Sequence, residues 1–281
     1  MRVFVAGATG AVGRRLLPLL LERGHEVIAA TRHPEKLAEL GVRRVLLDLL
    51  DRDAVLAAVR NAQPGAVLHQ VTDLSNRDLD ANALVRITGT RNLVDAARSA
   101  GVRRMVAQSI AFAYAPGQGP APESDPLHLD APPPRRRTVE GVVALEKVVA
   151  EMPEGVILRY GTLYGEGTWY APDGAVAESV RAGLLRATSG VTSFLHVDDA
   201  AHAAVAALDW PTGVVNIVDD EPAPGTEWVP YLAALLGAPP PPRTGRAEPW
   251  ERGATNARAR NELGWTPRWA SWRNGFCKLF G

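Results

Sequence analysis

The clearest chemical signature in the chain is a glycine-rich segment that follows its first short apolar run. Gly7, Gly10 and Gly13 are spaced as G-x-x-G-x-x-G, directly after residues 2–6 and at the start of an apolar helical pattern. Glycines at such a junction permit a tight turn and let backbone N–H groups approach a pyrophosphate, while the following helix N-terminus favours negative charge. The spacing therefore predicts a dinucleotide-binding loop.

The end of the second expected strand, residues 26–30, bears on which dinucleotide binds. Loops that bind NAD carry an acidic residue there, which accepts a hydrogen bond from the ribose 2′-hydroxyl. Here Arg32 and His33 follow the strand, and basic side chains can neutralise a 2′-phosphate. The sequence therefore favours NADP, with NAD as the second choice. Asp48, after the third strand, can either accept a hydrogen bond from the adenine amino group or cap the helix expected at 51–60.

These residues require a particular set of elements to position them. Short apolar runs predict strands at 2–6, 26–30, 43–47, 66–71, 103–109, 155–160, 192–197 and 213–218. Helical patterns lie between and after them, at 34–40, 51–60, 78–100, 138–151, 198–208 and 229–236. Strands that alternate with helices predict an α/β fold with a doubly wound parallel sheet, the Rossmann fold. The proline-rich stretch 115–137 is expected to be one long loop, with solvated arginines at 135–137.

Composition excludes several classes of protein. The 281 residues carry 31 basic and 31 acidic side chains, so bulk charge does not favour nucleic-acid binding. Cys277 is the single cysteine, and the histidines show no metal-ligand spacing, so neither a disulfide framework nor a metal site is expected. No apolar stretch approaches the ~18 residues of a membrane span, and the N-terminus does not read as a signal peptide. A cytoplasmic protein is expected, and the preference for arginine over lysine is typical of a GC-rich, bacterial genome.

The chain resembles the extended short-chain dehydrogenase/reductases, the NAD-dependent epimerase/dehydratase family. The resemblance rests on motifs in the family order: GATGAVG at 7–13, LDLLD at 47–51, VLHQV at 67–71, GTRNLVDAA at 89–97, VAQS at 106–109, ESDPL at 123–127, LRYGTLYGEG at 158–167, FLHVDDAA at 194–201 and LGWTPR at 263–268.

The resemblance implies a division of labour along the chain. Residues 1–165 would bind the nucleotide, with 192–218 returning to that domain, and 166–281 would mainly form a small C-terminal domain that covers the substrate. The implied coenzyme contacts are Gly7, Thr9, Gly10, Ala11, Val12, Gly13, Arg32, Asp48, Leu49, His69 and Tyr160. The family's two-helix interface makes a homodimer an expected assembly.

The family's usual proton-transfer pair is missing. Members normally use Tyr-x-x-x-Lys with a serine or threonine, because a lysine one helical turn away favours the tyrosine phenolate. None of the five tyrosines here is followed by a lysine four positions on. Alignment on the helix that carries Glu146 puts Thr138 at the tyrosine position and Val142 at the lysine position. The standard device is therefore absent, while the coenzyme site is intact.

Other hydroxyl groups are candidates for the missing donor. Ser109 falls at the family's serine position, Tyr114 lies in the loop after it, and Tyr164 matches the family's Tyr-Gly. For Asp198 and Asp199, beside His196, the expectation is structural, with one of them capping the next helix.

Three functions stay open at this point. The first is an NADP-dependent oxidoreductase that acts on a small organic carbonyl compound or related metabolite through a displaced proton donor. The second is a regulatory protein that binds NADP without hydride transfer. The third is an epimerase- or dehydratase-like enzyme that uses the nucleotide structurally.

Overall fold

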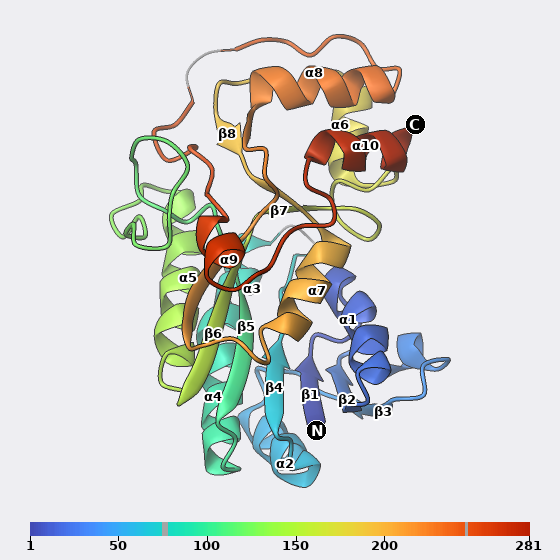
Figure 1. The fold of residues 1–281 in the computed structure, drawn as a ribbon, viewed down its shortest axis with the longest axis vertical. Coiled ribbons are helices and arrows are strands. Elements are labelled where there is room, and N and C mark those ends of the chain that lie inside the picture. The colour runs from blue at the N-terminus through green and yellow to red at the C-terminus, as the bar shows by residue number, and fades with distance from the viewer. Residues whose placement is uncertain (75–77, 245–246) are drawn as a thin grey trace. The chain divides into compact units, whose positions relative to one another are not determined.

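A computed structural model of the chain describes residues 1–74, 78–244 and 247–281 (Figure 1). Within these ranges the chain forms two compact units. Unit 1 comprises Met1–Ser109, Leu129–Leu158 and Ala201–Val214. Unit 2 comprises Ile110–His128, Arg159–Ala200 and Val215–Gly281.

The main sheet has seven strands in the order β10-β6-β5-β4-β1-β2-β3. The pairs β1–β2, β1–β4, β2–β3 and β4–β5 are parallel. The strands are β1 (Arg2–Ala6), β2 (Glu26–Thr31), β3 (Arg43–Leu46), β4 (Ala66–His69), β5 (Arg104–Ile110), β6 (Glu154–Tyr160) and β10 (Gly213–Ile217). The predicted doubly wound α/β fold is confirmed.

The strand order reverses beside β1. From β1 the chain proceeds to β2 and β3, and then returns to β4 on the other side of β1. Right-handed crossovers that run in opposite directions place their helices on opposite faces of a sheet. In open α/β sheets, ligands bind at the carboxyl ends of the strands where this reversal occurs. The glycine-rich segment, which follows β1, lies at that point.

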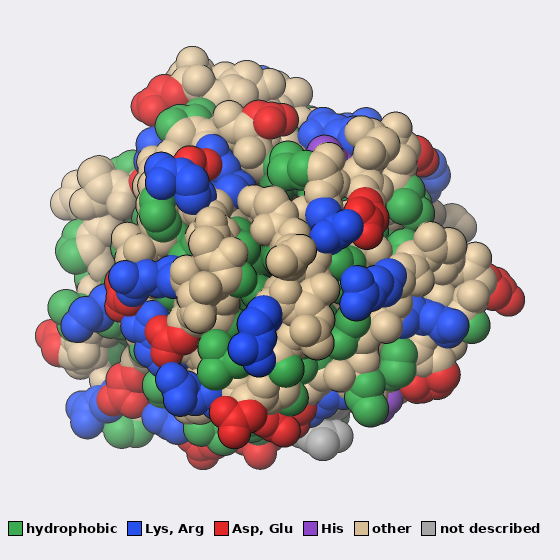
Figure 2. All heavy atoms as spheres, turned by 90° about the horizontal axis from the view of Figure 1, so that it is seen from below, with side chains coloured by type: hydrophobic (Ala, Val, Ile, Leu, Met, Phe, Trp, Pro, Cys, Tyr) green, Lys and Arg blue, Asp and Glu red, His purple; other side chains and the backbone are tan. Residues whose placement is uncertain are grey.

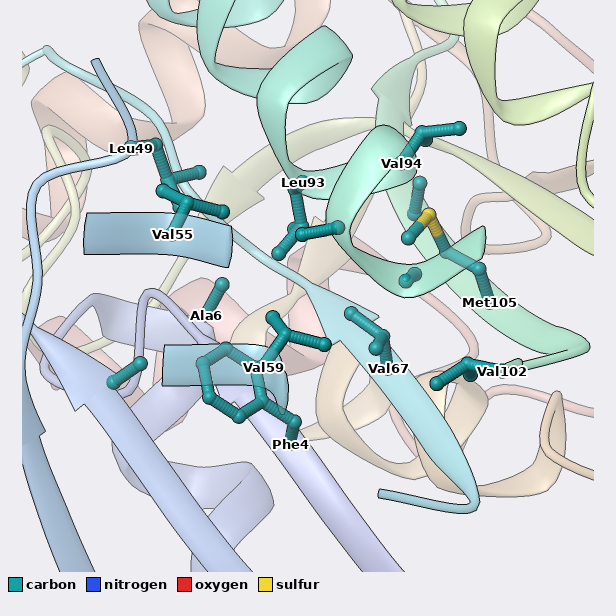
Figure 3. Packing of buried hydrophobic residues seen from close by; sticks show 14 of the residues in the cluster. Phe4, Ala6, Leu49, Val55, Val59, Val67, Leu93, Val94, Val102 and Met105 are labelled. Carbon is teal, nitrogen blue, oxygen red and sulfur yellow. The ribbon is translucent and has the colours of Figure 1, made fainter. Parts of the chain in front are cut away.

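Helices of unit 1 pack against the sheet. They include α1 (Ala11–Glu22), the 3₁₀ turn η1 (Pro34–Leu37), α2 (Arg52–Ala62), α3 (Leu79–Leu84), the π-helical segment η2 (Val85–Gly89), α4 (Thr90–Ser99) and α5 (Arg135–Val149). Val59 of α2 and Leu93 of α4 pack with Phe4 and Val67 of the sheet (Figure 3). Leu145 of α5 belongs to the same cluster. Full burial of such a side chain contributes about 1.5–3 kcal/mol, so this packing fixes the strands whose ends carry the site.

Unit 2 is built around aromatic side chains. Its strands are β7 (Thr162–Tyr164), which pairs with β9 (Phe194–His196), and β8 (Val191–Thr192), which pairs with β11 (Ala223–Pro224). Its helices include α6 (Ala175–Arg181), α8 (Gly225–Leu235), α9 (Ala257–Asn261) and α10 (Trp272–Phe280), while α7 (Val197–Ala206) continues into unit 1. Tyr164, Phe194, Trp228, Trp272 and Phe276 form the centre of its core.

One expectation about helices is confirmed and another was wrong. The helical pattern expected at 78–100 forms a continuous run from Leu79 to Ser99, in which η2 inserts a π-helical turn between α3 and α4. The loop expected over 115–137 ends early, because α5 begins at Arg135. Prolines 132–134 precede that first turn, where a missing N–H costs nothing, and the Arg136 N–H donates to the Pro132 carbonyl at 3.0 Å. The arginines at 135–137 are therefore helical.

Smaller differences have local causes. The strand expected at 192–197 is divided at Ser193, whose Oγ bonds to the backbone of Ala254 and whose flanking residues pair with different strands. The helix expected at 34–40 is only the 3₁₀ turn η1, and α8 begins at Gly225, four residues before the expected start at 229.

The surface carries charges of both signs. Figure 2 shows Lys and Arg side chains interspersed with Asp and Glu over one face of the molecule. Among the described residues, no helix has the length and apolar character needed to cross a membrane. Within the same ranges, no group of three or more His, Cys, Asp or Glu side chains is placed to hold a metal ion.

Candidate functional site

The glycine-rich loop between β1 and α1 is crowded at two of its three glycines. At Gly7, where φ is +88°, a Cβ atom would lie 2.7 Å from the carbonyl carbon of Gln70. At Gly13 a Cβ would lie 2.2 Å from the carbonyl oxygen of Gly7. At Gly10, in contrast, a Cβ would meet only the Gly7 oxygen, at 3.4 Å. The fold itself requires the first and last glycines, whereas Gly10 leaves space through which a ligand can approach the backbone.

The first turn of α1 supplies hydrogen-bond donors at this opening. Gly10 is the N-cap residue, and the N–H groups of the three residues that follow it have no acceptor within the helix. These donors and the helix dipole favour a phosphate group. Thr9 Oγ1 lies 2.6 Å from Thr31 Oγ1, which ties the loop to the end of β2. The loop therefore fits the phosphates of a dinucleotide.

The basic side chains after β2 both have acidic neighbours. Arg32 Nη1 lies 3.1 Å from Asp73 Oδ2, with the two side chains 50% and 20% exposed. His33 Nδ1 lies 3.5 Å from Glu35 Oε1. Both basic groups sit at the strand end where the adenosine ribose is recognised in this fold. Recognition of a 2′-phosphate by Arg32 stays a prediction.

Asp48 does not cap α2. Its Oδ1 accepts the Leu50 N–H at 2.9 Å, whereas Asp51 is the N-cap residue and accepts the Ala54 N–H at 3.0 Å. The capping alternative for Asp48 was therefore wrong, because Asp51 stands one turn closer to the first free N–H groups. Leu49 packs into the core of unit 1. The coenzyme contacts of Asp48 and Leu49 stay predictions.

His69 ends β4 opposite Ala6, so it lies beside the start of the glycine-rich loop. Its Nδ1 accepts the Val71 N–H at 3.3 Å, which assigns the ring proton to Nε2, and Nε2 donates to Thr90 Oγ1 at 2.9 Å. Burial, and to a smaller extent the charge of Arg86, lowers the pKa of His69 to about 4. The imidazole is therefore neutral near pH 7 and has both nitrogens engaged.

Ser109 belongs to a buried polar network in unit 1. Its Oγ donates to Glu146 Oε1 at 2.6 Å, and both residues are buried. Arg86 of η2 is 4% exposed and is attracted by Glu146, while burial lowers the pKa of Arg86 to about 10. Arg86 is therefore a cation at neutral pH, and the charge of Glu146 attracts it. The Ser109 proton is committed to Glu146, and Oγ keeps its lone pairs for other partners.

Helix α5 carries the two positions at which the family's tyrosine and lysine are expected. Thr138 is half-buried and Val142 is fully buried, and Glu146 follows one turn later. Lys147, the lysine of this helix, is exposed. The buried side of α5 therefore presents a carboxyl group rather than an ammonium group.

The hydroxyl groups of Tyr114 and Tyr160 are engaged within unit 2. Tyr114 Oη donates to Asn216 Oδ1 at 2.6 Å, and the guanidinium of Arg159 lies 4.7 Å from the centre of its ring. Burial raises the pKa of Tyr114, so the phenol keeps its proton at neutral pH. Tyr160 Oη donates to the carbonyl of Ala200 at 3.2 Å. Both tyrosines are buried, and their roles at the site stay predictions.

Tyr164 lies in the aromatic core of unit 2. Its ring centre is 5.0 Å from that of His196 and 5.2 Å from that of Phe276. Gly275 packs against the phenol, where a Cβ would lie 2.1 Å from the Tyr164 oxygen. Burial is the main cause that raises the pKa of Tyr164, and its hydroxyl has no hydrogen-bond partner among the described residues. A donor role for Tyr164 stays a prediction.

Asp199 lies in the first turn of α7, and a capping role for Asp198 or Asp199 stays a prediction. The Asp199 carboxylate accepts the N–H groups of Arg268 at 3.0 Å and Trp269 at 2.9 Å, and so fixes the chain that leads to α10. Asp198 lies in the first turn of α7, where its N–H donates to His196 Nδ1 at 3.1 Å. Both carboxyl residues thus have positions in the fold of unit 2.

Three polar residues of the site were missed from the sequence: Arg86, Glu146 and Asp73. Glu146 had a signal, because it follows Thr138 and Val142 at four-residue spacing and must share their helix face. Arg86 lies in an otherwise apolar stretch, and only the π-helical turn shows that it points inward. Asp73 carries no local pattern, and its partner Arg32 is 41 residues away in the sequence.

Known proteins are similar to this chain in sequence. The profile of the NAD dependent epimerase/dehydratase family matches residues 3–218. A 3-diazoavenalumate denitrifying reductase of a Streptomyces species is 49% identical, over 98% of this chain and 99% of its own. A 2-alkyl-3-oxoalkanoate reductase of Stenotrophomonas maltophilia is 30% identical, over 85% of this chain and 77% of its own.

Solved structures show the same fold. The UDP-glucose 4-epimerase of Thermus thermophilus, in complex with NAD, superposes with a TM-score of 0.78 and 26% identity, covering 100% of this chain and 97% of the other. The Bordetella bronchiseptica enzyme WbmG, also in complex with NAD, has a TM-score of 0.80 at 22% identity, covering 99% and 92%. These findings support a nicotinamide-dependent oxidoreductase or epimerase. The chain is therefore a member of the NAD dependent epimerase/dehydratase family.

Proposed function

We propose that the protein is an NADP-dependent reductase that replaces a diazo group on a small organic acid by hydride and releases dinitrogen. The observation that carries this proposal is the 49% identity to a 3-diazoavenalumate denitrifying reductase over 98% of the chain. The alignment spans both compact units, so it includes the coenzyme loop and the residues expected to cover the substrate, mainly 166–281.

The coenzyme would be held by unit 1. The open position at Gly10, the first-turn N–H groups of α1 and the Thr9–Thr31 contact suit the pyrophosphate, and Arg32 would bind the 2′-phosphate. When bound, the reduced nicotinamide supplies a hydride. His69 is neutral and has both ring nitrogens engaged, so it forms part of the site wall without exchanging a proton.

Removal of a diazo group needs little acid catalysis. The carbon that carries the diazonium group accepts the electron pair of the hydride, and the electron pair of the broken carbon–nitrogen bond leaves with dinitrogen. The positive charge of the diazonium group and the negative charge of the hydride cancel, so no proton is needed. Reduction of a ketone, in contrast, produces an alkoxide that must be protonated. An enzyme for the first reaction can therefore dispense with the Tyr-x-x-x-Lys pair, which this sequence lacks.

The hydrogen bond between Ser109 and Glu146 also favours a diazonium substrate over a carbonyl substrate. Ser109 donates its proton to Glu146, so its Oγ offers only lone pairs to a further group. A lone pair suits a positively charged diazonium group better than a carbonyl oxygen, which needs a donor. Ser109 is therefore proposed to face the substrate as an acceptor.

Isotope tracing of a single turnover tests the proposal. The purified protein is mixed with 3-diazoavenalumate labelled with heavy nitrogen and with NADPH deuterated at the transferable position. We expect one labelled dinitrogen per NADPH oxidised and deuterium on the carbon that carried the nitrogen. Oxidation of NADPH without release of labelled gas, or release without deuterium transfer, contradicts the proposal.

Carbonyl reduction is the second candidate, favoured by the 30% identity to a 2-alkyl-3-oxoalkanoate reductase. In that reaction Ser109, Tyr114 or Tyr164 would have to supply the proton. Turnover of 3-oxoacids with NADPH, but not of diazo compounds, selects this candidate. If NADP binds tightly and neither substrate class reacts, the regulatory alternative replaces both.

A further inference from the structure

An ion pair joins the two loops that flank the glycine-rich segment. Arg32 directly follows β2, and Asp73 follows β4. β1 lies between these two strands in the sheet, and the glycine-rich loop begins where β1 ends. The 3.1 Å contact between Arg32 Nη1 and Asp73 Oδ2 therefore spans the carboxyl end of β1, where the coenzyme phosphates are expected.

The two partners are held unequally. The backbone N–H of Asp73 donates to Asn82 Oδ1 at 3.0 Å, and Asn82 is buried on α3, so the segment that carries the carboxylate is anchored. The Arg32 side chain is 50% exposed, against 20% for Asp73. A long arginine side chain can leave its partner by rotation of its own bonds. Arg32 is thus the partner that moves when another anion competes for it.

We propose that Asp73 is a specificity-determining residue for the coenzyme, because it competes with the 2′-phosphate of NADP for Arg32. The inference rests on the proposed function, in which Arg32 binds that phosphate. NADP must draw the guanidinium away from Asp73, or bring a phosphate close to a carboxylate. NAD carries a neutral hydroxyl at that position and leaves the ion pair intact. Asp73 therefore lowers the preference for NADP and keeps NAD usable.

The test compares Asp73→Asn with Glu35→Gln by titration of the intact protein with NADP and with NAD, without substrate. Both variants remove one negative charge near the end of β2. Glu35, however, is 66% exposed and faces His33 rather than Arg32. Release of a partly exposed ion pair changes binding by about two- to fivefold. We expect Asp73→Asn to lower the Kd of NADP by that factor and to leave the Kd of NAD within twofold, roughly the scatter of such measurements.

Several results overturn the inference. These are an unchanged ratio of the two dissociation constants in Asp73→Asn, an equal change for both coenzymes, or the same change of ratio in Glu35→Gln. Thermal unfolding of each variant checks the fold, and the bond to Asn82 persists in Asp73→Asn because it uses the backbone N–H.

A double-mutant cycle with Arg32→Ala separates this inference from the proposed coenzyme choice. If Asp73 acts through Arg32, Asp73→Asn has no effect on the ratio once Arg32 is absent. If Arg32→Ala itself leaves the NADP-to-NAD ratio unchanged, the proposed reading of the 2′-phosphate fails. If Arg32→Ala weakens NADP and Asp73→Asn changes nothing, only the role of Asp73 is rejected.

Discussion

Two buried carboxyl groups, one in each compact unit, are stabilised in different ways. Glu146 in unit 1 accepts the Ser109 hydroxyl and has the buried cation Arg86 beside it. Asp219 in unit 2 is 1% exposed, against 8% for Glu146, and it accepts backbone N–H groups, from Trp272 at 2.8 Å and Glu221 at 3.2 Å. Burial raises the pKa of Asp219 to about 8.

The contrast lies in the groups that surround each buried acid. Glu146 has a buried cation and a hydroxyl group beside it, whereas Asp219 has two backbone N–H groups, and burial leaves Asp219 holding its proton near neutral pH. Tyr164 of unit 2 behaves in the same way, because burial raises its pKa as well. Unit 1 therefore holds a buried cation next to its buried carboxyl group, and unit 2 places Asp219 beside a largely aromatic core.

The largest expected effect is the change of the unfolding free energy with pH that the raised pKa of Asp219 causes. Its folded pKa of about 8 lies above its ordinary value of 3.8, so its stabilising contribution is complete below about pH 4 and is lost as pH rises through about 8. The change is on the order of 5 kcal/mol. Urea unfolding of the wild type and Asp219→Asn across this range measures it. We expect the wild type to lose stability relative to the variant as pH rises, and parallel curves would break the comparison.

Removal of the cation tests the other carboxyl group. Arg86→Met removes the buried cation that attracts Glu146, and loss of one partner from a buried ion pair costs about 3–5 kcal/mol of unfolding free energy. Arg103→Met is the matched control, because Arg103 is 68% exposed and pairs with Glu154 at 3.0 Å, a contact worth at most about 1 kcal/mol. Equal losses in the two variants would show that Arg86 and Glu146 do not act as a buried pair.

Coenzyme binding should depend on Gly10 of unit 1, a position where the fold itself does not require glycine. Gly10→Val places a side chain where only the Gly7 oxygen lies near, so the fold persists while the phosphates lose backbone donors. Loss of two charge-assisted hydrogen bonds corresponds to about a hundredfold rise in the Kd of NADP. Calorimetry and thermal unfolding measure the two effects. Gly13→Ala provides the contrast, since its Cβ would collide with backbone and lower the melting temperature instead.

The smallest effects are expected at the hydroxyl groups. If the reaction releases dinitrogen, Ser109→Ala, Tyr114→Phe and Tyr164→Phe should each keep the turnover number within about tenfold, because no proton is transferred to the product carbon. If the protein reduces a carbonyl group, removal of the true donor should cost about 10²–10⁴-fold. Single-turnover rates with each class of substrate distinguish the two results, and a large loss with the diazo substrate would contradict the proposed chemistry.

Local patterns were sufficient to predict the fold and the glycine-rich turn between β1 and α1. The run from β1 through the glycines to α1 is contiguous, and its requirements are steric: at Gly7 and Gly13 the backbone leaves no room for a side chain. The alternation of apolar runs predicted the parallel sheet, because a strand buried on both faces needs only a continuous apolar segment. The apolar run at 103–109 likewise predicted that Ser109 lies near the end of β5.

The tertiary structure alone decided the charge state and partners of the site. Ser109 and Glu146 are 37 residues apart, and Arg32 and Asp73 are 41 apart, so no local spacing relates them. The inward direction of Arg86 depends on one π-helical turn, and the burial of Tyr114 and Tyr164 depends on contacts with distant segments such as Asn216 and Gly275. Hydrogen bonds and pKa values depend on distance and on exclusion of water, and these exist only after the chain has packed.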